Sequence, residues 1–103
     1  KISKSSNIDL KNSKFDPIYK GLRNSVLAGT SKECNYLKFQ PSGKTGTISE
    51  RYNQKNSAWF IGFAPYYNPE IAIVIFIKNG RGATSAAPLA KRVFKCYYEL
   101  FHH

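Results

Sequence analysis

The sequence predicts an α+β fold, in which a small antiparallel sheet of about three strands packs with a preceding helix and a C-terminal helix. Apolar residues recur at helical spacing in residues 17–28 and again in residues 86–101. Between these segments, two apolar runs are joined by a turn that contains two Pro residues. Because the chain has 103 residues, we expect one compact unit with no room for a second core.

The first helix is predicted at residues 17–28. Asp16 precedes Pro17. An Asp side chain can accept hydrogen bonds from the unpaired backbone N–H groups at the start of a helix, and Pro suits the first turn because it has no backbone N–H group that would need a partner. Gly29 can take the left-handed conformation that ends a helix. The apolar positions at helical spacing are Ile18, Leu22 and Val26.

The middle of the chain is predicted to form strands. We expect a short strand at residues 36–40, a turn at 41–43 and a polar loop at 49–57. Residues 58–64 and 71–77 have the composition of an antiparallel hairpin. Since both alternating faces of residues 71–77 are apolar, this strand needs cover on both faces. Helices on each side or a place in the middle of a larger domain would supply it.

The C-terminal helix follows a predicted turn at residues 79–82. Thr84 or Ser85 can cap it, and Pro88 in its first turn lacks only an N–H group that would have no partner there. We expect one stripe of this helix to be buried, formed by Ala86, Ala90, Val93, Phe94, Tyr97 and Phe101.

The two ends of the chain carry less information. Residues 1–14 are mostly Lys, Ser and Asn and are predicted to be an extended leader or linker. His102 and His103 are as typical of a tag remnant as of native sequence. The sequence begins at Lys1 and contains no Met, which indicates a piece of something longer.

The chain is strongly basic, with 16 Lys and Arg against six Asp and Glu and a formal net charge of +10. This charge favours polyanions such as nucleic acid, anionic lipid or an acidic wall polymer. The cations are scattered from Lys1 to Lys95, however, so no nucleic-acid partner is expected. Cys34 and Cys96 belong to no metal or redox motif, and their pairing is left open. We expect no cofactor and no metal.

Residues 42–47 read Ser-Gly-Lys-Thr-Gly-Thr and are the one compact segment with chemical content. A Walker A phosphate loop would require Gly at position 38, which is Lys. In an arbitrary protein a bare Lys-Thr-Gly is more often a Gly-rich turn with an exposed Lys. The surrounding sequence favours a more specific interpretation.

The motif and the strand after it, Ala-Trp-Phe-Ile-Gly-Phe-Ala-Pro at residues 58–65, resemble the third active-site motif and next strand of penicillin-binding proteins and serine β-lactamases. Residues 67–73 resemble the last hairpin of class B, elongation-type members, and residues 85–88 the start of their final helix. Upstream, residues 19–26 and the pair Gly29-Thr30 resemble the family helix and the Gly-Thr turn that precede the motif strand. The resemblance covers roughly residues 16–100 and implies that residues 15–101 are the C-terminal segment of a transpeptidase domain.

The resemblance implies roles for four residues. Lys44 is a catalytic group that assists proton transfer and anchors substrate. Thr45 and Thr47 offer hydroxyls to the carboxylate of a D-Ala-D-Ala stem peptide or a β-lactam. The backbone N–H of Thr47 is half of an oxyanion hole, and Gly46 leaves the cleft wall unobstructed.

The resemblance also indicates what the chain lacks. No Ser is followed three residues later by Lys, so the family's nucleophile motif is absent, and the chain alone is expected to be inactive. Residues 5–7, Ser-Ser-Asn, match a second family motif by chance. The parent protein is expected at the outer face of the bacterial cytoplasmic membrane, held by an N-terminal anchor that this chain lacks. Its implied partners are peptidoglycan stem peptides, β-lactams and the remainder of the domain.

Two other functions stay open on sequence alone. A serine β-lactamase or β-lactam sensor shares the motif and the Trp-Phe strand, and a basic non-catalytic binding module would account for the charge. The strand aromatics Trp59, Phe60, Phe63 and Phe76 are assigned to packing, because aromatics flanked by apolar residues on strands are usually core.

Overall fold

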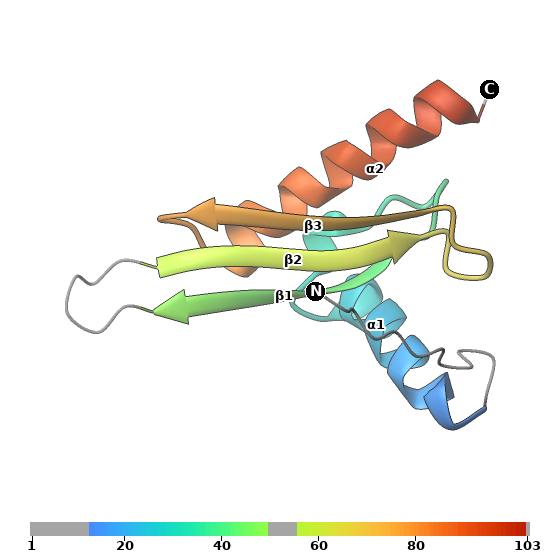
Figure 1. Ribbon diagram of the computed structural model, residues 1–103, viewed down its shortest axis with the longest axis horizontal. Helices are drawn as coiled ribbons and strands as arrows, with labels where there is room; N and C mark the ends of the chain where they lie inside the picture. Colours follow the sequence, from blue (N-terminus) through green and yellow to red (C-terminus); the bar gives the residue numbers. More distant parts are fainter. Residues whose placement is uncertain (1–12, 50–55, 103) are drawn as a thin grey trace, which may run out of the picture.

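A computed structural model describes residues 13–49 and 56–102 (Figure 1). Most of the predicted leader, the Ser-Ser-Asn match at residues 5–7, the centre of the predicted polar loop and His103 lie outside the described residues. The elements in chain order are the 3₁₀ turn η1 (Ser13–Phe15), α1 (Asp16–Ala28), the 3₁₀ turn η2 (Lys32–Cys34), β1 (Ser42–Ser49), β2 (Asn56–Ala64), β3 (Ile71–Lys78), the π-helical turn η3 (Gly82–Ala86) and α2 (Ala87–Phe101).

The three strands form one antiparallel sheet in the order β1-β2-β3, as the sequence predicts. Its register sets Gly46 of β1 opposite Trp59 of β2, and Trp59 opposite Phe76 of β3. Since successive side chains of a strand point to opposite faces, these three residues share one face, and Thr45, Phe60 and Ile75 share the other. The predicted α+β fold is confirmed.

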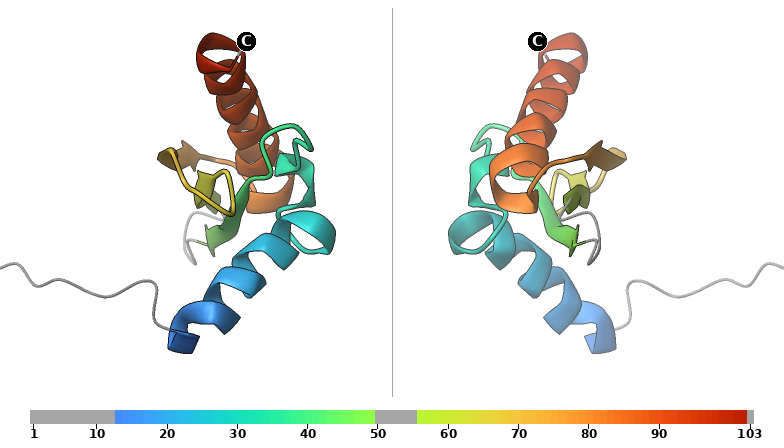
Figure 2. Two further views of the ribbon diagram at one scale, coloured as in Figure 1. Left: turned by 90° about the vertical axis from the view of Figure 1, so that its right-hand side faces the viewer. Right: turned by 90° about the vertical axis from the view of Figure 1, so that its left-hand side faces the viewer.

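The core lies between the sheet and α2, which crosses one face (Figure 2). Phe60 of β2 and Phe94 of α2 are fully buried and meet edge to face with ring centroids 6.2 Å apart. Burying a side chain of this size contributes about 1.5–3 kcal/mol. Around this pair pack small residues of β2, η3 and α2 and the inward isoleucines of β3, namely Ala58, Ala64, Ala86, Ala87, Ala90, Ile71, Ile73, Ile75 and Ile77.

The opposite face of the sheet is not covered by any described residue of this chain. Val74 is 69% exposed, Phe76 59% and Ile61 49%. The α2 helix and η2 lie on the other side, and α1 lies beside the β1 edge (Figure 2). The sequence left two ways to cover a strand with two apolar faces, and the described residues supply a helical layer on one face only. A place within a larger domain is the alternative that fits.

The α1 helix begins and ends differently from the prediction. Asp16 is its first residue and not its cap; Phe15 occupies the cap position, and no side chain caps the helix. The 3₁₀ turn η1 runs directly into α1, so its backbone is already coiled before Asp16. Gly29 has φ −107° and ψ −152°, which is extended and not left-handed. The chain leaves α1 by straightening, although the Gly29 N–H still donates to the Ser25 carbonyl.

The predicted strand at residues 36–40 is wrong. The N–H groups of Phe39 and Gln40 both donate to the Tyr36 carbonyl at 3.0 Å, which closes a tight turn. Gln40 has a positive φ of 54°, and β1 begins at Ser42, inside the predicted turn. The reason is burial, because the turn allows Phe39 to reach the aromatic side chains of α2 and become 1% exposed. An extended segment would carry its ring past them.

The α2 helix is confirmed in position but not in its cap. No side chain caps it, because the π-helical turn η3 precedes it and the N–H groups of Ser85 and Ala86 donate to the Arg81 carbonyl. Of the predicted stripe, Ala86, Ala90 and Phe94 are buried, whereas Phe101 is 66% exposed because α2 runs beyond the sheet (Figure 1). Among the described helices, neither has the length and hydropathy that a bilayer span requires.

Candidate functional site

The motif predicted from sequence lies on an ordered strand. Residues 42–49 form β1, and its first six residues are the Ser-Gly-Lys-Thr-Gly-Thr segment. All of them pair with β2, from Ser42 opposite Phe63 to Thr47 opposite Ala58. A Gly-rich surface turn, the commoner setting of such a string, is therefore excluded. Because β1 has no neighbour on its other side among the described strands, it presents a sheet edge there.

Lys44 and Thr45 converge on one hydroxyl at this edge. The Lys44 ammonium donates to Thr30 Oγ1 at 2.7 Å, and Thr45 Oγ1 lies 3.1 Å from the same atom. Because adjacent residues of a strand point to opposite faces, Lys44 and Thr45 can both reach one residue only if that residue lies beside the edge of the sheet and not above either face. Thr30, two residues after the end of α1, is that partner, and α1 itself packs against β1.

Gly46 is required by Trp59, which lies directly opposite it. A Cβ atom added to Gly46 would meet the Trp59 indole at 2.2 Å from Nε1 and 2.7 Å from Cε2. The sequence predicted that Gly46 keeps a cleft wall clear. In the structure the missing side chain makes room for an indole on the uncovered face. Trp59 is 39% exposed there.

Thr47 is exposed and lies opposite Ala58 in the β1-β2 register. In an antiparallel pair the backbone N–H groups of one strand point alternately toward and away from its neighbour. An edge strand therefore offers N–H groups to a ligand placed beside it. Thr45 and Thr47 thus lie on the same edge strand as Lys44.

The start of β1 is anchored from α1. The Arg23 guanidinium donates to the Pro41 carbonyl at 2.6 Å, just before the motif. Burial lowers the pKa of Arg23 from its ordinary value, but the group stays cationic at any physiological pH. A charge-assisted bond of this kind fixes where β1 enters the sheet, and so it fixes the positions of Lys44 and Thr45, the third and fourth residues of β1.

A model of the penicillin-binding protein transpeptidase domain matches residues 2–95 of the chain. The chain is 40% identical over 83 residues to a peptidoglycan D,D-transpeptidase MrdA of Acinetobacter baumannii, an alignment that covers 67% of this chain and 12% of that protein. The chain belongs to the penicillin-binding protein transpeptidase domain family. It spans about an eighth of the length of that relative.

Solved structures of penicillin-binding proteins share the fold. Pseudomonas aeruginosa PBP2, in complex with WCK 5153, superposes with a TM-score of 0.78 at 29% identity and covers 94% of this chain and 22% of its own. The transpeptidase domain of the FtsI4 D,D-transpeptidase from Legionella pneumophila superposes with a TM-score of 0.75 at 30% identity. That match covers 81% of this chain and 34% of that domain. The predicted class B penicillin-binding protein fragment is confirmed.

The strand aromatics of this transpeptidase segment divide between two environments. Phe60 is core, and Phe63 meets the Tyr19 ring of α1 edge to face at 6.0 Å, so packing is confirmed for both. Within this chain the predicted packing role is wrong for Phe76, whose side chain lies on the uncovered face. For Trp59 the predicted role is only partly right, because its contact is with Gly46. Sheet alternation places both on the face that this chain's helices leave open.

The sequence missed two residues of the site. Thr30 accepts the hydrogen bond of Lys44, and Arg23 binds the backbone at the start of β1. Thr30 lies just after α1 and is 14 residues from Lys44, and Arg23 lies on α1 and is 18 residues from Pro41. The resemblance included the Gly29-Thr30 pair as a turn but assigned Thr30 no part in the chemistry. No local pattern in the sequence connects either residue with the strand.

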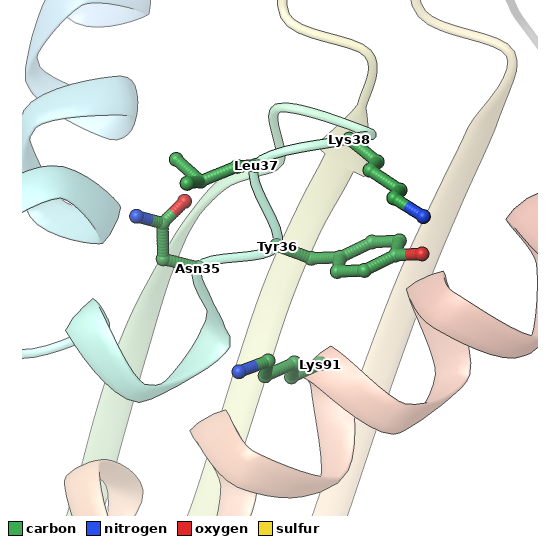
Figure 3. A pocket seen from close by; sticks show the side chains of 5 residues that line it. All are labelled: Asn35, Tyr36, Leu37, Lys38 and Lys91. Carbon is green, nitrogen blue, oxygen red and sulfur yellow. The ribbon is translucent and has the colours of Figure 1, made fainter.

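A separate hollow of about 450 Å³ lies away from the motif (Figure 3). It is formed by the turn before β1 and by α2, and none of Lys44, Thr45, Gly46 or Thr47 lines it. Its lining residues are Asn35, Tyr36, Leu37, Lys38 and Lys91. Within the described parts of the chain, no three His, Cys, Asp or Glu side chains come together to hold a metal ion.

Both cysteines are free thiols, which answers the pairing question that the sequence left open. Cys34 is buried at the end of η2, whereas Cys96 is exposed on α2. Burial raises the pKa of the Cys34 thiol to about 12. Because the thiolate is the reactive form, Cys34 is an inert core residue and no nucleophile.

Proposed function

We propose that this chain is the part of a peptidoglycan D,D-transpeptidase that supplies one wall of its active-site cleft. The observation that carries the proposal is the pair of hydrogen bonds that holds Lys44 and Thr45 at the free edge of β1. That edge offers a cation, hydroxyls and strand N–H groups together. These are the groups that a carboxylate and a developing oxyanion need.

Each motif residue has a separate role in this proposal. Lys44 provides a positive charge that assists proton transfer when the acyl-enzyme forms and anchors the substrate. Thr45 and Thr47 bind the terminal carboxylate of a D-Ala-D-Ala stem peptide, or the matching carboxylate of a β-lactam. The Thr47 N–H stabilises the tetrahedral oxyanion, where a single donor typically changes the rate by about 10²–10³-fold.

The nucleophile has to come from elsewhere in the parent protein. No Ser of this sequence has Lys three residues later, and acyl transfer requires a serine oxygen that attacks the D-Ala-D-Ala carbonyl and expels D-alanine. The remainder of the transpeptidase domain is therefore the chain's first partner. It would also cover the open face of the sheet around Val74 and Phe76. The parent acts in the bacterial cell envelope, at the outer face of the cytoplasmic membrane.

The role of Lys44 is tested by covalent labelling of the parent protein with a fluorescent penicillin. Lys44→Ala is expected to slow labelling by about 10²–10⁴-fold, the usual contribution of a positioned proton-transfer group. Lys78→Ala is the matched control, because Lys78 is an exposed lysine on β3. Labelling of Lys44→Ala at the wild-type rate would exclude the proposed role of Lys44. Rapid release of hydrolysed drug by the wild type would instead indicate a β-lactamase.

The carboxylate contact is tested separately with two donor peptides. One ends in free D-Ala-D-Ala and the other in its C-terminal amide, which cannot form the charge-assisted hydrogen bond. Thr45→Val is expected to lower kcat/KM about tenfold for the free acid and to leave the amide within about twofold. Equal losses for both peptides would show that Thr45 does not bind the carboxylate.

A further inference from the structure

Thr30 lies at the convergence of the motif side chains, yet it belongs to no motif. Its hydroxyl oxygen is 2.7 Å from the Lys44 ammonium nitrogen and 3.1 Å from the Thr45 hydroxyl oxygen. These are the two side chains to which the proposed function assigns proton transfer and carboxylate binding. An atom that contacts both can set the position of each relative to the other.

The backbone around Thr30 is held on both sides. The N–H groups of Gly29 and Ser31 both donate to the Ser25 carbonyl, at 3.1 and 3.0 Å. Ser31 is fully buried, and its hydroxyl is 2.9 Å from the Ser25 hydroxyl. A residue between two such anchors has little freedom to move. Thr30 is thus exposed at its side chain but fixed at its backbone, as a positioning residue needs to be.

The Thr30 hydroxyl oxygen accepts both hydrogen bonds. A lysine ammonium only donates, so Thr30 Oγ1 accepts from Lys44, and the Thr45 hydroxyl donates to the same oxygen. One acceptor, held by a fixed backbone, therefore sets the Lys44 ammonium and the Thr45 hydroxyl at defined positions relative to each other. A carboxylate at this edge can accept hydrogen bonds from both groups at once.

We propose that Thr30 is a positioning residue, which holds the Lys44 ammonium and the Thr45 hydroxyl together at the edge of β1 that pairs with no described strand, in position for the substrate carboxylate. The inference rests on the function proposed above. It adds a residue from the segment after α1 to a site that the sequence places entirely on β1. Thr30 acts through Lys44 and Thr45 and does not itself contact the reacting atoms.

The test is a double-mutant cycle in the parent protein, read by the second-order rate of labelling with a fluorescent penicillin. Thr30→Val keeps the shape and removes the hydroxyl, and it is expected to slow labelling about tenfold, as for a lost hydrogen bond to a charged group. Thr30→Ser restores the hydroxyl and is expected to label within about twofold of wild type. In a Lys44→Ala background, Thr30→Val is expected to slow labelling by no more than about threefold further, because only the contact with Thr45 remains.

The controls separate positioning from stability. Thr84→Val alters an exposed threonine near the start of α2 and is expected to leave labelling unchanged. Thermal unfolding of each variant reports whether the fold is kept, and Thr30→Ala removes the same hydroxyl as a second variant should Thr30→Val lose the fold. A positioning role leaves the melting temperature near wild type while the labelling rate falls.

Each alternative outcome has a different meaning. Wild-type labelling of Thr30→Val, together with slow labelling of Lys44→Ala, would overturn this inference and leave the proposed function standing. An equal loss in the presence and absence of the Lys44 side chain would show that Thr30 does not act through Lys44, and it would overturn this inference. Wild-type labelling of Lys44→Ala itself would instead remove the role of Lys44 on which the inference rests.

Discussion

Gly46 and Trp59 give the sharpest prediction about the site, because the contact between them can be removed from either side. In Gly46→Ala, the new Cβ would lie 2.2 Å from Trp59 Nε1, about 1 Å short of the nearest ordinary van der Waals contact. The indole must rotate away or β1 must move away from β2. Overpacking of this kind costs about 1–3 kcal/mol.

The backbone contributes with the opposite sign. An Ala in a strand interior is more favourable than a Gly by roughly 0.5–1 kcal/mol, because Gly loses more conformational freedom on folding. The expected net effect of Gly46→Ala is therefore a destabilisation of about 0.5–2 kcal/mol. Since Thr47 follows directly, any shift of β1 also moves its N–H group, and we expect penicillin labelling of the parent to slow.

The sign of the stability change decides between the explanations. In a Trp59→Ala background the clash is gone, and Gly46→Ala is expected to stabilise the domain by about 0.5–1 kcal/mol. Urea denaturation of the parent transpeptidase domain gives the free energy of unfolding for the four proteins of the cycle. If Gly46→Ala destabilises equally with and without the indole, the requirement for Gly at this position has another cause than Trp59.

Three further predictions concern the rest of the fold. Phe60→Ala, at a fully buried position, should lower the free energy of unfolding by about 3–5 kcal/mol. Phe101→Ala, at a position 66% exposed, should change it by less than about 0.5 kcal/mol. Urea denaturation compares the two variants, and similar losses of stability would contradict the assigned core. Because the pKa of the Cys34 thiol is raised from 9.0 to about 12, its stabilising effect is present below pH 9 and is lost as pH rises toward 12. At pH 8 a thiol reagent should modify the chain at Cys96 and leave Cys34 unmodified until denaturant is added, and peptide mapping that finds Cys34 modified in the folded chain would contradict its burial. Val74→Ser should alter the free energy of unfolding of this chain by about 0.5 kcal/mol or less but lower that of the parent domain by more than about 1 kcal/mol. Equal small effects in both would show that the remainder of the domain does not cover the sheet face that carries Val74.

The sequence predicted the parts of the fold that depend on local pattern. Apolar periodicity located α1, α2 and the β2-β3 hairpin, and the Lys-Thr-Gly segment with its following Trp-Phe strand indicated the family. These features consist of residue types at short separations, so neighbouring residues in the sequence carry them. The errors lie where a long-range contact overrides local preference. Residues 36–40 have strand-like composition but turn so that Phe39 can reach α2.

The amino-acid sequence by itself determined the class of fold, the family and the identity of the motif residues, because each of these depends on residue types at fixed separations along the chain. Only the tertiary structure decided how those residues are held. It placed Thr30 against Lys44 and Thr45, Arg23 against the start of β1, and Trp59 over Gly46. Contacts between residues distant in the chain depend on strand register and on the path of α1 past the sheet edge, and no local pattern specifies either.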